Sequence, residues 1–315
     1  MSNSAPACGR FTRRFLTEEP GMRERFGDPL RLLEPECKVI QFREPLTPTQ
    51  LERAGALVAD RPDVQLYVYL DASRDLNFLR YFPNLRRLHV ALYKLEDVTG
   101  FSAVAGSIEE LTFGKTKRSF SLRVLEPMTR LRTLFLVGHK KDISVVSGLT
   151  NLASLGLSGI TLPDLSLLVP LRALRELQIF FGGATNLSHL PRLPALEELW
   201  LMRITKLSDL SVLANLVGLT KLKLDWMRNV ASLPSLRRLA RLTDVTLDTM
   251  KGLTDLSPVA AAPALRRLAI AGMPQLTTDS FRCLVGRARL EELWVGTGRH
   301  KVNEAVKAMF PGIAR

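Results

Sequence analysis

The sequence has few of the features that mark disulfide-rich, membrane-spanning or metal-binding proteins. Its three cysteines, Cys8, Cys37 and Cys283, form an odd set without paired spacing, so we expect no disulfide framework and a reducing compartment. No stretch approaches 18 apolar residues and no apolar run follows the basic residues near the start, so we expect neither a membrane span nor a signal peptide. Four scattered histidines without metal-ligand spacing predict no metal and no cofactor.

Signals of catalysis are equally sparse. Gly114-Lys115-Thr116 has the form of the end of a phosphate-binding loop, but the glycine required five residues earlier is Glu109. Pairs of glutamates at 109–110, 197–198 and 291–292 recur at equivalent places and therefore indicate solvated starts of strands. We expect a protein that is not an enzyme and takes no small-molecule substrate.

The sequence does contain a repeat. From Leu85 onward the pattern L-x-x-L-x-L returns ten times at intervals of 21–25 residues. Its first residues are Leu85, Ile108, Leu131, Leu152, Leu174, Leu196, Leu219, Leu242, Leu265 and Leu290. A fixed period in the twenties means that each unit adds one strand to a stack, because no unit can bury its leucines alone.

Segments outside the regular units complete the predicted architecture. Val39–Phe42 and Gln65–Leu70 alternate like strands, which gives about 12 strands. Thr47, Pro48 and Gln50 form a helix start with a capping box. We divide the chain into an N-terminal extension or cap at 1–36, a solenoid at 37–300 and a C-terminal helical cap at 301–315.

The second half of each unit has its own signature. Asp-Leu-Ser or a close variant recurs there, as at Asp164-Leu165-Ser166 and Asp209-Leu210-Ser211. The short polar side chains can cap the free N–H groups of a brief helical turn while the apolar residue enters the core. Short helical turns should therefore line the side opposite the strands.

Together these two signatures resemble the leucine-rich repeat family, in particular the bacterial 22-residue internalin-like and SDS22-like subclass. The best match runs from Leu196-Glu197-Glu198-Leu199-Trp200-Leu201 through Lys206-Leu207-Ser208-Asp209-Leu210-Ser211-Val212-Leu213, and the resemblance covers roughly 38–300. It implies an α/β fold, a right-handed curved horseshoe with a parallel concave sheet that binds proteins. The asparagine that the family places after the strand is mostly replaced, by Ile160, Ile204, Met227, Met250 and Met273, so we expect apolar packing to hold the turns.

Strand alternation identifies the residues that should face out of the sheet. Three positions on each of eleven strands give 33 positions, of which six are aromatic, against 7% aromatic residues in the chain. Large aromatics on such a face are typical anchors of protein interfaces. The predicted protein-binding residues are Tyr67, Tyr69, Arg87, His89, Phe135, Glu176, Gln178, Phe180, Glu198, Trp200, Met202, Lys223, Asp225, Asp248 and Trp294.

Charge on this face argues against a nucleic-acid groove. Seven acidic and four basic residues give −3 on a chain whose net charge is +13, whereas phosphate binding needs clustered cations. The basic excess is densest between Lys115 and Lys141. That segment is either a solvated rim or, as an alternative function, a site for nucleic acid or anionic membrane.

We therefore predict a non-enzymatic, cytoplasmic, monomeric protein of bacterial type that binds a protein ligand on its sheet. A lesser alternative is an intracellular inhibitor or immunity-type protein that acts on an enzyme or toxin.

Overall fold

The structure, a computed structural model, describes residues 38–42, 46–69, 73–184 and 186–315. The extension expected at 1–36 lies outside these residues. The chain divides into two compact units, one ending at Leu134 and the other beginning at Phe135.

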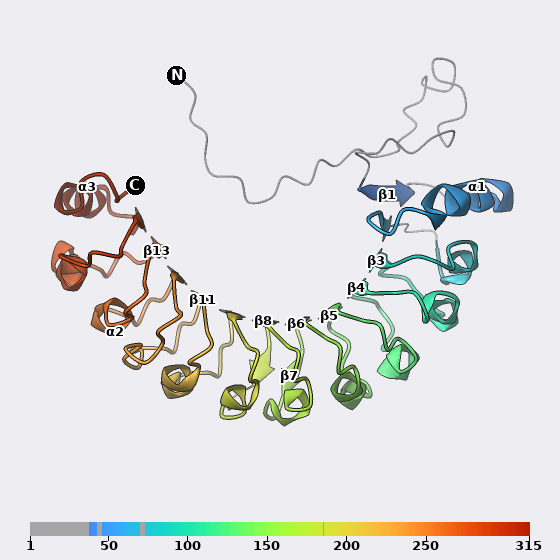
Figure 1. Ribbon diagram of the computed structural model, residues 1–315, viewed down its shortest axis with the longest axis horizontal. Coiled ribbons are helices and arrows are strands. Elements are labelled where there is room, and N and C mark those ends of the chain that lie inside the picture. Colours follow the sequence, from blue (N-terminus) through green and yellow to red (C-terminus); the bar gives the residue numbers. More distant parts are fainter. Residues whose placement is uncertain (1–37, 43–45, 70–72, 185) are drawn as a thin grey trace, which may run out of the picture. The chain divides into compact units, whose positions relative to one another are not determined.

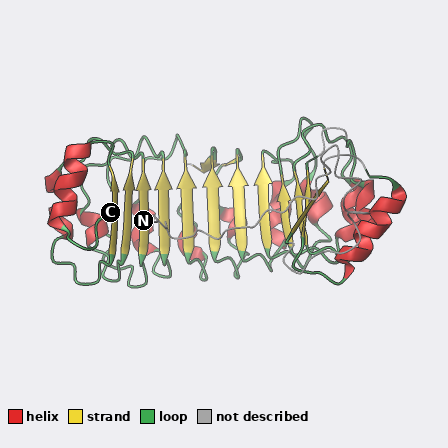
Figure 2. Cartoon of the chain, turned by 90° about the horizontal axis from the view of Figure 1, so that it is seen from above, coloured by secondary structure: helices red, strands yellow, loops and turns green. Residues whose placement is uncertain are grey.

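Twelve parallel strands form one sheet in chain order, which confirms the predicted fold class (Figures 1 and 2). They are β1 (Val39–Phe42), β2 (Gln65–Val68), β3 (Arg87–Val90), β4 (Glu110–Phe113), β5 (Thr133–Val137), β6 (Ser154–Ser158), β8 (Glu176–Phe180), β10 (Glu198–Met202), β11 (Lys221–Asp225), β12 (Asp244–Asp248), β13 (Arg267–Ala271) and β14 (Glu292–Gly296). A separate two-stranded sheet pairs β7 (Thr161–Leu162) with β9 (Gly183–Ala184). Strand β2 ends two residues before the predicted Leu70, which lies outside the described residues.

Short helices connect the strands, as the 21–25-residue period requires. The 3-10 helices are η1 (Asn77–Tyr81), η2 (Thr99–Val104), η3 (Leu122–Leu125), η4 (Ile143–Gly148), η5 (Ser166–Leu168), η6 (Leu190–Arg192), η7 (Ser211–Asn215) and η8 (Thr278–Leu284). The α-helices are α1 (Pro48–Ala59), α2 (Ser257–Ala260) and α3 (His300–Met309). In each unit the helical turns lie on the side of the repeat opposite the strands (Figure 1).

The core lies between the sheet and these turns. Leu199 of β10 pairs in register with Leu222 of β11, and both side chains are buried. All five apolar residues that replace the family asparagine are buried as well, which confirms the predicted apolar turns. Neighbouring repeats thus share one continuous layer of side chains within each unit.

Asx turns precede six of the helical segments, as predicted. A side-chain oxygen accepts the N–H of the residue two positions later at 2.7–2.8 Å. The acceptors are Asp75, Asp97, Asp164, Asn186, Asp209 and Asp255. Asp142 differs, because its backbone is left-handed with φ of 58°.

The predicted capping box is present at α1, and a helix occupies the C-terminal segment. Thr47 and Gln50 form the reciprocal capping box of α1. After α3, the last residues pair with β14: the N–H of Arg315 donates to the carbonyl of Leu293 at 2.8 Å. This pairing covers strand edge groups that would otherwise be open to another chain.

Candidate functional site

The residues predicted to face outward lie on the side of the sheet opposite the buried leucines, which we call the open face. On β8, β10, β11 and β12, the positions of Gln178, Trp200, Lys223 and Thr246 stand in one register row, and all four side chains are half-buried. The row lies on four neighbouring strands of the second unit.

An aromatic cluster forms on this face around Phe180. The Phe180 ring packs edge-on against Trp200 with centroids 4.6 Å apart, and the Phe135 centroid lies 5.9 Å from it. Phe135 reaches across β6 because the intervening position is Gly156, where an added Cβ would lie 2.1 Å from the Phe135 ring. A glycine on the middle strand therefore permits contact between aromatics on strands that are not neighbours.

Trp200 is also tied to β11 by two polar contacts. Its indole N–H donates to Oδ2 of Asp225 at 2.7 Å, and Nζ of Lys223 lies 3.7 Å from the ring centroid. Burial raises the pKa of the Asp225 carboxyl above its usual value. The Trp200 hydrogen bond and the charge of Lys223 lower this pKa, but their effects are smaller than that of burial. Its Oδ1 is buried and has no hydrogen-bond partner among the described residues.

Two sequence expectations are wrong here. Phe180 and Asp225 were expected to be exposed contact residues, but they are only 8% and 5% exposed. Phe180 is covered by the rings of Phe135 and Trp200, and Asp225 by Trp200 and Lys223. Phe135, Trp200 and Lys223 are half-buried and therefore more accessible on the open face than Phe180 and Asp225.

The charged column at the start of the strands forms an alternating ladder. Glu198, Lys221, Asp244, Arg267 and Glu292 stand in register on five neighbouring strands. Lys221 pairs with Glu198 at 2.6 Å, Arg267 pairs with Asp244, and Arg315 pairs with Glu292 at 3.2 Å. Opposite charges directly across a sheet favour one register, so the expected acidic surround is largely neutralised by neighbouring cations.

Glu176, Met202 and Asp248 flank this region. Glu176 accepts a hydrogen bond from Ser154 at 2.9 Å, Asp248 accepts one from the hydroxyl of Thr249, and Met202 is half-buried. At the last strand, Trp294 is exposed, and its ring lies over the backbone of Gly296.

The first unit has a smaller aromatic pair. The rings of Tyr67 and His89 stack with centroids 4.2 Å apart. Burial lowers the pKa of His89 to about 4, so the imidazole is neutral at pH 7. Arg87 pairs with Glu110 at 3.1 Å, and Tyr69 beyond the strand is exposed.

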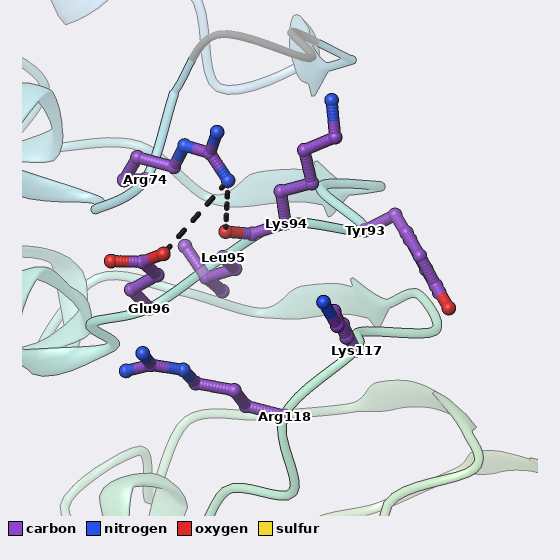
Figure 3. A pocket seen from close by; sticks show the side chains of 7 residues that line it. All are labelled: Arg74, Tyr93, Lys94, Leu95, Glu96, Lys117 and Arg118. Atoms are coloured by element: carbon purple, nitrogen blue, oxygen red, sulfur yellow. Dashed lines mark hydrogen bonds and ion pairs between the residues drawn. The ribbon is translucent and has the colours of Figure 1, made fainter.

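A basic pocket of about 520 Å³ lies beside the ends of β3 and β4 (Figure 3). Its lining consists of Arg74, Tyr93, Lys94, Leu95, Glu96, Lys117 and Arg118. Arg74 donates to the backbone carbonyl of Lys94 at 3.4 Å and lies 3.9 Å from the carboxylate of Glu96. Four cations and one acid line this pocket, which places part of the predicted basic segment in a defined concavity.

The predicted binding residues do not include a further group just past the strands: Phe181, Arg203 and Trp226. Phe181 and Trp226 are exposed, and the Arg203 guanidinium lies between their rings. Strand alternation cannot place residues beyond the last strand position. The available signal was the corresponding position in other repeats, where glycine stands at Gly138 and Gly159.

The described residues contain no group of three or more His, Cys, Asp or Glu side chains that could hold a metal ion. In the same part of the chain, no helix is long and apolar enough to cross a membrane.

The chain matches no protein-family model, and no curated protein matches it with significance. Its fold is similar to that of an internalin from Listeria monocytogenes, at TM-score 0.59 and 20% identity over 82% of this chain and 79% of that one. A leucine-rich repeat protein from Leptospira interrogans gives TM-score 0.59 and 16% identity over 88% and 72%. A chain of the yeast Rad7 and Elc1 complex gives 0.51 and 14% over 85% and 82%. With its repeated strands, apolar turns and these likenesses, the chain has the leucine-rich repeat fold.

Proposed function

We propose that this chain is a non-enzymatic scaffold that binds a protein partner on the open face of its second unit. The observation that carries this proposal is the surface formed by Phe135, Trp200 and Lys223. Its two rings are held in place by ring contacts with Phe180 and by the hydrogen bond from Trp200 to Asp225. Rigid aromatics beside a cation are typical of interface hot spots, because they bury apolar area at little cost in side-chain entropy.

The mode of binding would be that of a preformed surface. Core leucines fix the backbone of β8 to β14, and the alternating charges from Glu198 to Glu292 fix the register of β10 to β14. The partner would therefore meet positions that are already ordered. We place the protein in a reducing compartment such as the cytoplasm, as a monomer, from its cysteine usage and its capped sheet edge. One fold neighbour comes from a complex of two yeast proteins, which is consistent with a scaffold role.

Blocking the open face tests the proposal. Gln178→Arg with Thr246→Arg places long side chains on both sides of Trp200 and Lys223 without touching the core. Val217→Arg with Val285→Arg is the matched control, because both valines are exposed and lie outside the sheet. Affinity capture from lysate, quantified by mass spectrometry, should recover a protein with wild type and control that the open-face variant loses. An identical set of captured proteins for all three would contradict the proposal.

The basic pocket supports a second candidate function, the binding of nucleic acid or anionic membrane. Charge reversal by Lys117→Glu and Arg118→Glu should leave capture of the protein partner intact if the open face is the main site. Oligonucleotides and anionic vesicles would be the direct probes, and phosphate binding should fall steeply with salt.

A further inference from the structure

In seven successive repeats of the second unit, the residue that follows the strand has a left-handed backbone. These residues and their φ values are Gly138 (76°), Gly159 (66°), Phe181 (54°), Arg203 (55°), Trp226 (55°), Thr249 (52°) and Gly272 (57°). Each N–H donates at 2.8–3.0 Å to the last carbonyl of the next strand. These backbone hydrogen bonds explain the left-handed conformation, and glycine adopts it at both ends of the series.

Four consecutive repeats nevertheless carry a side chain at this position. A bulky residue in the left-handed region is strained, and such strain is kept where the side chain serves a purpose. Neither aromatic side chain adds to the core, because Phe181 is 53% and Trp226 41% exposed. Core packing is therefore not the reason for these two residues.

The side chains form an ordered array, which we call the rim ladder: Phe181, Arg203, Trp226 and Arg228. The guanidinium carbon of Arg203 lies 5.9 Å from the Phe181 ring centroid and 6.0 Å from that of Trp226. The guanidinium carbon of Arg228 lies 5.8 Å from the centroid of the same Trp226 ring. Cation–π contacts hold the faces of these guanidinium groups, which leaves their N–H edges available.

A pocket of about 380 Å³ adjoins the rim ladder. Phe181, Arg203 and Lys206 line it, and the last two are the only charged residues of its lining. A side chain at position 182 would not fit, because a Cβ there would lie 2.6 Å from the carbonyl of Ile160. Gly182 therefore contributes only backbone to the lining. Within the part of the chain that the structure describes, neither Arg203, Lys206 nor Arg228 has an ion-pair partner.

We propose that the rim ladder and its pocket form a docking site for an acidic segment of a protein, with a carboxylate on the N–H edge of Arg203. This inference rests on the proposed function in one respect, that the ligand is a protein. A planar guanidinium edge matches a carboxylate in a two-point contact, and the exposed rings supply apolar area beside it. Lys206 offers a second positive charge within the same pocket.

Charge on the neighbouring open face favours a protein over a nucleic acid. The outward columns of β8 to β14 carry six acidic residues, Glu176, Glu198, Asp225, Asp244, Asp248 and Glu292, against three basic ones, Lys221, Lys223 and Arg267. A nucleic acid carries negative charge along its whole length, but beyond the pocket the open face offers it no cluster of unpaired cations, because Lys221, Lys223 and Arg267 are each paired with a carboxylate. A protein segment can confine its carboxylates to the rim.

Fluorine NMR of protein labelled with 5-fluorotryptophan tests the site, because the chain has three tryptophans. The probes are hexaglutamate, hexaglutamine and the oligonucleotide (dT)6. Hexaglutamate should shift the Trp226 resonance and hexaglutamine should not. Arg203→Gln with Lys206→Gln should weaken this binding at least tenfold, whereas Lys117→Gln with Arg118→Gln, which removes the same charge, should not.

Tighter binding of (dT)6 at Trp226, or equal weakening by the control pair, would overturn the proposal. Failure of the open-face proposal can be distinguished from failure of this one. The open-face proposal is tested by partner capture with the variant Gln178→Arg with Thr246→Arg. A further variant, Phe181→Gly with Trp226→Gly, should lose the Arg203-dependent binding of hexaglutamate, measured by calorimetry. Its Tm should be unchanged or raised. A Tm several degrees lower would show that the two rings serve the fold and would also overturn the proposal.

Discussion

Trp200 of β10 donates its indole N–H to Asp225 of β11, and this bond at 2.7 Å joins an aromatic side chain of one repeat to a buried carboxylate of the next. The arrangement is costly by itself, since burial raises the pKa of Asp225 and its Oδ1 lacks a partner among the described residues. Trp200 is therefore part of the support for its neighbours as well as part of the open face.

Replacing Trp200 by alanine should lower the free energy of unfolding by about 2–4 kcal/mol. The loss combines an aromatic pair with Phe180, a cation–π contact with Lys223 and the donor to a buried carboxylate. The sequence alone predicts almost no change, because it places the ring free on the sheet. Denaturant unfolding measures the effect.

A double-mutant cycle with Asp225→Ala isolates the coupling between Trp200 and Asp225, and Asp225→Asn is the companion variant that keeps the hydrogen bond. Asparagine keeps an acceptor for the indole while removing the buried charge, so this single variant should be near neutral at pH 7. Trp200→Ala that melts like wild type would mean that the ring contributes nothing to the fold.

The difference between sequence and structure at Trp200 follows from what periodicity can report. The leucine period places Leu199 inside and Trp200 outside, and both placements are correct. It says nothing of how far an outward side chain leans across neighbouring strands. The burial of Phe180 and Asp225 depends on such leaning, and so does the reach of Phe135 over Gly156.

The turns also combine a feature that the sequence predicts with one that it does not. Replacement of the family asparagine by apolar residues predicts packed turns, and residues such as Met227 and Met250 are buried. The left-handed backbone at Arg203 and Trp226 has no comparable signal in its own repeat, since neither residue type favours that conformation. Only alignment with Gly159 or Gly272 in other repeats could have indicated it.

Truncating the shared core should be strongly destabilising. Leu199→Ala and Leu222→Ala should each lower the free energy of unfolding by about 2–5 kcal/mol, because both side chains are buried between neighbouring repeats. Urea unfolding followed by circular dichroism gives the values. Wild-type stability for both variants would show that the strand register is wrong.

His89 should make the first unit sensitive to mild acid. Burial lowers its folded pKa to about 4 from an ordinary value of 6.5, so between these values the unfolded chain binds more protons. Stability should therefore be complete above pH 6.5 and fall as the pH drops toward 4, by about 2 kcal/mol after allowance for partial exposure.

Denaturant unfolding at pH 7 and pH 5 measures this dependence, with His89→Gln as the control that stays neutral beside Tyr67. Carboxylates with lowered pKa, such as Asp97 and Asp209, lose their contribution only at lower pH, and Asp225 acts in the opposite direction because its pKa is raised. Equal pH slopes in the two proteins would remove His89 as the cause.

The cost of the left-handed turn can be measured at a position with no other role. Gly159 has φ of 66° and open space around an added Cβ, so Gly159→Ala should be destabilising by about 1 kcal/mol through backbone strain alone. Gly148→Ala is the matched control, since Gly148 is also exposed and unhindered but lacks a positive φ, and it should be neutral or slightly stabilising. Thermal unfolding of the two variants gives the difference. If Gly159→Ala is as stable as Gly148→Ala, the turn tolerates side chains freely, and strain at Phe181 and Trp226 ceases to be an argument for their function.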